Sequence, residues 1–169
     1  MKAGAHFEEL IVSTGMHTKE EIEELIDLLA TNAQKFTIMH CVANYPLNPE
    51  DANLNRIDEL KKMTEGMECA SVGYSDHGLD LTVSGVAMAK GISYLEKHFS
   101  LSRYLPQTPH QMFKDGPLVT THEVSIEPSE LLELSVLRDA IELINGSNEF
   151  KMNEVEQKIK DRYLNRYGV

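Results

Sequence analysis

Residues 69–77 read Cys-Ala-Ser-Val-Gly-Tyr-Ser-Asp-His, and this stretch decides the fold. Residues 69–74 form a mostly apolar run, which is typical of a strand covered on both faces in a parallel sheet. The polar and titratable residues Ser75, Asp76 and His77 follow directly. In parallel α/β sheets, reactive residues gather where the strands end. The stretch therefore predicts a parallel strand that leads into a functional site.

Strand and helix signals alternate on both sides of this stretch. Further strands are predicted at 10–12, 36–42 and 92–95. Helices are predicted at 18–33, 54–66 and 79–89, and Thr18 with Glu21 three residues later is typical of a capping box. Parallel strands need crossover connections, so this order predicts an α/β fold of parallel β/α units.

The rest of the chain is expected to be a long loop followed by helices. The loop covers 100–125, one helix follows from 127 to 146, and an amphipathic helix ends the chain at 153–167. We therefore divide the chain into a β/α domain at 1–146 and a C-terminal helical extension at 147–169.

Composition bounds the possible functions. The 169 residues are 41% hydrophobic and 25% charged, which is enough for one domain with its own core. The formal net charge of -11 argues against binding to nucleic acid or to anionic membranes. No signal peptide or membrane span is expected. Cys41 and Cys69 lack the spacing of a metal or redox motif, so we expect buried, reduced thiols in a cytoplasmic protein.

Two histidines occupy equivalent strand ends. His77 and His98 follow neighbouring strands, which lie about 4.8 Å apart in a sheet, so they could share one metal ion. Ser75 lies two residues before His77 and Glu96 two before His98, and such pairs share a face of an extended chain. This set could bind a divalent cation and leave positions open for substrate oxygens. Hydrogen-bonded structural histidines are the alternative.

Other strand ends carry weaker signals. Ser13 and Thr14 before Gly15 could bind a phosphate or form a simple turn. Tyr45 could form the wall of a pocket or belong to a turn. Asp76 could orient an imidazole or cap the next helix.

Taken together, these strand ends resemble the sialic acid synthase family, also called N-acetylneuraminate or nonulosonate synthases. The order and spacing of the motifs agree from 10 to 146. The resemblance implies the C-terminal half, strands 5–8, of a TIM (β/α)8 barrel. The matching motifs lie at 13–16, 40–46, 73–77, 96–99 and 125–128.

The resemblance also implies an activity. The family condenses phosphoenolpyruvate with N-acetylmannosamine or a related N-acetylated amino sugar and releases phosphate. It implies a divalent ion, manganese or magnesium, on His77 and His98, with Glu96 as a further catalytic residue beside the two histidines. The residues expected to bind substrate are Ser13, Thr14, Asn44, Tyr45, Ser75 and His122.

The chain departs from the family pattern in ways that affect these expectations. Ala43 stands where a polar residue is usual, and Thr121 replaces the aspartate before His122. The first four barrel strands, with their phosphate-binding lysines, are absent from these 169 residues, so we expect no activity from the chain alone. It would pair with itself or with a complementary N-terminal half-barrel. The alternatives are a non-catalytic half-barrel for binding or assembly, and an unrelated metal-dependent aldolase.

Overall fold

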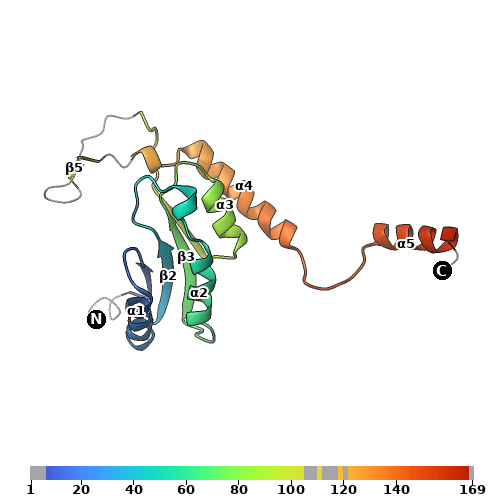
Figure 1. The fold of residues 1–169 in the computed structure, drawn as a ribbon, viewed down its shortest axis with the longest axis horizontal. Helices are drawn as coiled ribbons and strands as arrows, with labels where there is room; N and C mark the ends of the chain where they lie inside the picture. The colour runs from blue at the N-terminus through green and yellow to red at the C-terminus, as the bar shows by residue number, and fades with distance from the viewer. Residues whose placement is uncertain (1–6, 105–109, 112–117, 120–121, 168–169) are drawn as a thin grey trace.

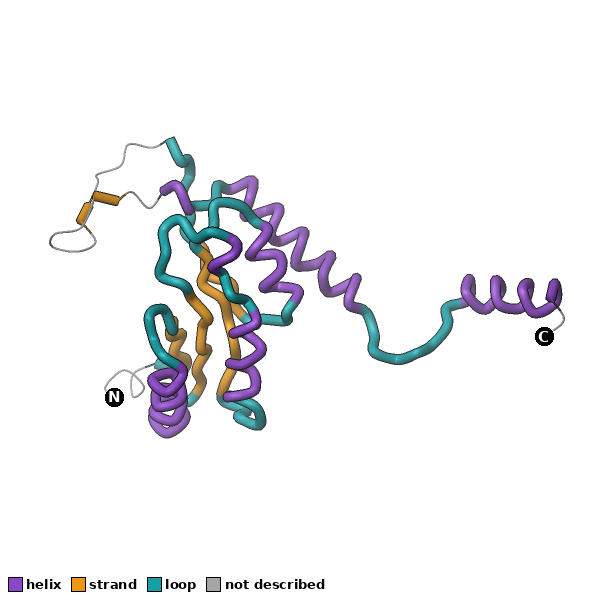
Figure 2. The backbone as a smooth tube through the Cα atoms, in the orientation of Figure 1, coloured by secondary structure: helices purple, strands orange, loops and turns teal. Residues whose placement is uncertain are grey.

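The computed structural model describes residues 7–104, 110–111, 118–119 and 122–167, in which strands and helices alternate before two final helices (Figure 2). The alternating elements are β1 Glu9–Ser13, α1 Lys19–Asn32, β2 Lys35–Cys41, α2 Asn55–Met63, β3 Ala70–Asp76, α3 Thr82–Ala89 and β4 Tyr94–Lys97. The final helices are α4 Pro128–Asn145 and α5 Glu154–Tyr167.

The main sheet is parallel and open, in the order β1-β2-β3-β4. Flat strands at about 4.8 Å spacing would separate β1 and β4 by about 14 Å. Yet the Tyr94 hydroxyl on β4 donates a hydrogen bond of 3.2 Å to the Glu9 carboxylate on β1. This contact across the open face fits a curved sheet, and the parallel order with helices between the strands confirms the expected half-barrel of β/α units.

Helices α1, α2 and α3 pack on the convex face of this sheet and form one hydrophobic core with it (Figure 1). Helix α4 in turn packs on α3, where a Cβ on Gly85 would meet the Leu137 side chain at 3.0 Å. A side chain at this position would force Leu137 to shift by a few tenths of an ångström, so α3 and α4 approach closely here. The buried core residues of sheet and helices include Ile26, Leu29, Phe36, Ile38, Ile57, Leu60, Val72, Tyr74, Val83 and Ala87.

Local capping explains where the helices begin. The Thr18 hydroxyl accepts a hydrogen bond from the Glu21 amide, and the Glu21 carboxylate accepts one from the Thr18 amide, which confirms the capping box before α1. Glu127 and Glu130 form an equivalent reciprocal pair before α4. Both helices therefore start close to the predicted positions.

The structure differs from the prediction in short elements. Helix α3 starts at Thr82 and not at 79, and β4 starts at Tyr94 and not at 92. The predicted loop at 100–125 contains an antiparallel pair, β5 His110–Gln111 and β6 Leu118–Val119. It also contains a 3-10 helix at His122–Val124, and another 3-10 helix at Pro49–Asp51 went unpredicted. Elements of two or three residues carry no hydrophobic period, so pattern analysis misses them.

The concave face of the sheet is open among the described residues. Ile11 is 51% exposed and Tyr94 is 40% exposed, although both lie on strands. Figure 1 shows α5 beyond the end of α4 and away from the sheet. No helix in the described part of the chain is long and apolar enough to cross a membrane. The proposed division between 146 and 147 stays a prediction.

Candidate functional site

His77 and His98 lie side by side, as their strand positions predict. Asp76 pairs with Lys97 in the register of β3 and β4, so the next residue on each strand is a histidine. The two imidazole centroids are 5.4 Å apart and the rings are nearly perpendicular, at 81°. His77 Nδ1 lies 3.1 Å from the Val42 carbonyl oxygen, to which it can only donate. The other ring nitrogen, Nε2, then carries a lone pair, as a metal ligand requires.

Tyr45 completes a cluster of three rings at this edge. It comes from the loop after β2, and its ring centroid lies 4.0 Å from that of His77 and 5.7 Å from that of His98. Partial burial raises the pKa of the Tyr45 phenol, so the hydroxyl stays protonated at neutral pH. Tyr45 therefore lies against both histidine rings, and its expected role in substrate binding stays a prediction.

Ser75 and Glu96 meet one step deeper along the same strands. They are partners in the β3–β4 register, and the Ser75 hydroxyl donates a 2.6 Å hydrogen bond to the Glu96 carboxylate. Cys41, the register partner of Ser75 on β2, is a free and half-buried thiol whose pKa is raised by burial. A raised pKa argues against an activated Cys41 thiolate. The polar groups that this layer offers to a substrate are therefore those of Ser75 and Glu96.

The other predicted substrate residues lie at the same edge with different surroundings. Ser13 is exposed at the end of β1. Thr14 is buried, and its hydroxyl donates to the Met39 carbonyl at 2.9 Å, so its proton is committed to the backbone. Asn44 is exposed in the loop after β2. His122 begins a 3-10 helix, but its side chain lies outside the described part, as does all of Thr121.

An ion pair on the opposite face of these strands was not predicted. The Lys97 ammonium lies 3.0 Å from the Asp76 carboxylate, and both side chains are buried. Asp76 also accepts hydrogen bonds from the Ser84 hydroxyl on α3 and from the Gly78 amide at 2.8 Å. Asp76 thus anchors the end of β3 to α3 and to β4. Only the three-dimensional pairing of two distant residues reveals this anchor.

The two histidines suit a cation whose other coordination positions are filled by water or substrate oxygens. Among the described residues, no group of three or more His, Cys, Asp or Glu side chains could hold a metal ion. Two imidazoles with water or substrate oxygens on the other positions are compatible with an open site. Imidazole nitrogen is a common ligand of divalent metal ions, so His77 and His98 fit the general donor chemistry of such a site.

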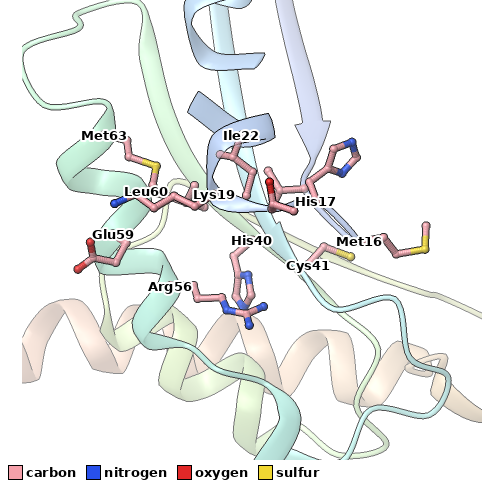
Figure 3. Close-up of a pocket in the computed structure, with 12 residues that line it drawn as sticks. Met16, His17, Lys19, Ile22, His40, Cys41, Arg56, Glu59, Leu60 and Met63 are labelled. Atoms are coloured by element: carbon pink, nitrogen blue, oxygen red, sulfur yellow. The ribbon is translucent and has the colours of Figure 1, made fainter. Parts of the chain in front are cut away.

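A separate cavity of about 380 Å³ lies on the helix side of the sheet, between α1 and α2 (Figure 3). His40 faces it from β2, and its Nε2 donates to the Ala52 carbonyl at 2.7 Å. Burial lowers the pKa of His40, and the nearby Arg56 lowers it further. Lys19 and Arg56 also line this cavity. It is distinct from the His77–His98 cluster.

Comparison with known proteins identifies relatives of one kind. The model of the NeuB family matches residues 1–149. An N,N'-diacetyllegionaminic acid synthase of Campylobacter jejuni is 34% identical over 88% of this chain and 41% of its own length. An N-acetylneuraminate-9-phosphate synthase of Drosophila melanogaster is 27% identical over 88% of this chain and 40% of its own length.

A solved structure agrees with these relatives. The N-acetylneuraminic acid synthetase of Leptospira borgpetersenii, crystallised with citrate, has a TM-score of 0.72 and 30% identity. The match covers 93% of this chain and 49% of that one. The chain therefore spans about two fifths of the length of the curated relatives named above and half of this solved chain.

The buried His40 should make stability depend on pH. Its pKa in the folded chain lies below the unfolded value near 6.5, so the unfolded chain binds the proton more readily. We expect the free energy of unfolding to fall as pH drops from about 7.5 through the unfolded pKa near 6.5 towards the lower folded value. His40→Gln, which can still donate to Ala52, should weaken this dependence. Urea denaturation at several pH values measures it, and an equal slope in both proteins would contradict the prediction.

Proposed function

The chain belongs to the NeuB family of sialic acid and nonulosonate synthases, and on that premise we propose that it supplies half of a synthase active site. The proposed reaction condenses phosphoenolpyruvate with N-acetylmannosamine or a related N-acetylated amino sugar and releases phosphate. The observation that carries the proposal is the meeting of His77 and His98 directly above the hydrogen-bonded pair Ser75–Glu96.

In this proposal His77 and His98 hold a divalent ion, Mn²⁺ in preference to Mg²⁺. When bound, the ion would polarise the open-chain aldehyde of the amino sugar. The Val42 carbonyl keeps the proton of His77 on Nδ1, which turns the lone pair of Nε2 towards the ion. Tyr45 packs against both rings and limits their rotation.

The remaining residues would act on the substrates. A new carbon–carbon bond joins the methylene carbon of phosphoenolpyruvate to the aldehyde carbon. Water adds to the central carbon of phosphoenolpyruvate, and the carbon–oxygen bond to phosphate breaks. The Ser13 and Ser75 hydroxyls would contact phosphoenolpyruvate, and the Glu96 carboxylate, held by Ser75, would contact the reacting groups. Asn44 and Tyr45 stand at the edge where the sugar would enter.

A non-catalytic half-barrel that serves in binding or assembly is the second candidate. The open parallel sheet, whose outer edges pair with no other described strand, would suit such a role. A gene for the complementary upstream half next to this one would favour the enzyme. Metal binding without any complementary half would favour the module.

In the described part of the chain, the outer edges of β1 and β4 pair with no other strand, which supports a partner for the half-barrel. A groove of about 380 Å³ lies between β4 and α4, with apolar side chains that include Leu95, Phe99, Ile126, Leu131 and Leu134. It is where another strand could add to β4, since an edge strand offers unpaired backbone groups. We propose that the partner is a second copy or a complementary N-terminal half. The free thiols of Cys41 and Cys69 favour a reducing compartment such as the cytoplasm.

Metal binding is the first test. We expect the purified chain to bind one Mn²⁺ per His77–His98 site, measured by isothermal titration calorimetry. The double variant His77→Ala, His98→Ala should lose this binding, because it removes both imidazole ligands. His17→Ala, which alters an exposed histidine in the separate cavity, is the matched control and should bind as wild type does. Equal binding by the double variant would refute the site.

Activity of the chain alone is the second test. We expect no phosphate release that depends on both phosphoenolpyruvate and N-acetylmannosamine. The reason is that the phosphate-binding lysines implied for the other half are missing from these residues, and charge contacts of that kind are worth about 3 kcal/mol each. A phosphate-release assay with His98→Ala as the background measures it. Release above that background would show that the 169 residues suffice.

Self-association is the third test. Because no described strand pairs with the outer edges of β1 and β4, we expect the chain at micromolar concentration to exceed its monomer mass of 19.1 kDa in light scattering behind size exclusion. Ile11→Lys, on the open face of β1, should shift the chain towards monomer. Leu143→Lys, on the exposed surface of α4, should leave the assembly unchanged. A stable 19.1 kDa wild-type species would contradict the prediction.

A further inference from the structure

The ion pair Asp76–Lys97 lies directly behind the two histidines. Its side chains are 0% and 3% exposed, which is rare for charged groups in a domain of this size. Successive side chains on a strand point to opposite faces. Ser75 and His77 therefore face the open side of the sheet, whereas Asp76 faces the helices, and the same holds for Lys97 between Glu96 and His98.

Lys97 contacts both neighbours of His77. Its ammonium lies 3.0 Å from the Asp76 carboxylate and donates a 2.8 Å hydrogen bond to the Gly78 carbonyl. Since Lys97 itself precedes His98, its side chain connects the two residues that flank His77, through the Asp76 carboxylate and the Gly78 carbonyl, to the strand that leads to His98. Ser84 on α3 binds the same carboxylate and holds the group against the helix layer.

The Asp76–Lys97 ion pair lies where the hydrogen-bonded pairing of β3 and β4 ends. The register of β3 and β4 ends at the pair Asp76–Lys97, so both histidines lie one residue beyond it. The backbone carbonyl of His77 accepts from the Leu47 amide at 2.9 Å, whereas that of His98 accepts from the Ile126 amide at 2.8 Å. Each histidine is thus tied to a different loop, and Lys97 joins the two sides.

We propose that Asp76 and Lys97 are positioning residues that set the separation and orientation of the imidazoles of His77 and His98. This inference rests on the proposed metal function of those histidines. A buried ion pair is weak evidence for stability, because desolvation offsets much of its attraction, whereas it can specify geometry. The ion pair lies behind the two proposed ligands. Groups in such positions commonly orient metal ligands.

The central variant is Lys97→Met, which keeps an unbranched apolar stem and removes the ammonium. We expect Mn²⁺ affinity, measured by calorimetry, to fall about tenfold or more relative to wild type. Lys90→Met is the matched control, because it breaks another lysine–aspartate pair, Lys90–Asp58 at 2.6 Å, away from the strand ends. The control should bind Mn²⁺ as wild type does, and Lys97→Arg, which retains a cation, should recover part of the affinity.

A second measurement reports ring geometry without metal. Long-range proton–nitrogen NMR spectra of the metal-free chain should show shifted or doubled imidazole signals for His77 and His98 in Lys97→Met, and unchanged signals in Lys90→Met. Single-histidine variants assign the signals. If Lys97→Met fails to fold because Asp76 is left unpaired, Asp76→Asn with Lys97→Met removes both charges together and takes its place.

The outcomes separate the two proposals. Wild-type affinity together with wild-type imidazole signals in a folded Lys97 variant would overturn the positioning inference. Failure of the wild-type chain to bind Mn²⁺ would instead overturn the proposed metal site. The NMR spectra would still decide whether the ion pair positions the two rings.

Discussion

The parallel register of β1 to β4 is the constraint on which the candidate site depends. Because all four strands run in one direction, the residues after each strand meet at one edge of the sheet. His77 and His98 are 21 residues apart in sequence, yet the register brings their rings to 5.4 Å. A shift of one residue between β3 and β4 would turn one histidine towards the helices and separate the pair.

The two faces of the sheet carry different kinds of side chain. The helix face is an apolar core in which Phe36, Ile38, Val72 and Tyr74 pack against α1, α2 and α3. The Asp76–Lys97 pair is set into that face at its functional end, with all its charges paired. At the strand ends the open face carries Ser13, Ser75 and Glu96, whereas Ile11 and Tyr94 lie further along the strands. The site therefore lies on one face, and the groups that hold it in place lie on the other.

Much of this arrangement follows from sequence patterns alone. Apolar runs predict the strands, and the rule that polar residues follow parallel strands predicts that His77 and His98 lie side by side, whereas the contact of Tyr45 with both rings does not follow from the sequence. Sequence patterns could not show how a side chain uses its hydrogen bonds. Thr14 commits its hydroxyl to the Met39 carbonyl, and Asp76 pairs with a lysine 21 residues away. Such partners depend on register and rotamer, which periodicity does not encode.

Edge pairing, more than burial of the open face, would drive the proposed assembly. On the open face, the Thr37 hydroxyl donates to the Glu9 carboxylate at 3.0 Å and lies 2.6 Å from the Ser71 hydroxyl. Tyr94 donates to the same carboxylate from β4. These polar side chains would be solvated by water as readily as by one another, so exposing them costs little. The edges of β1 and β4 differ, because their outward backbone groups can pair fully only with another strand. A partner that adds strands at those edges would satisfy the backbone and close the wall around the histidine site in one step.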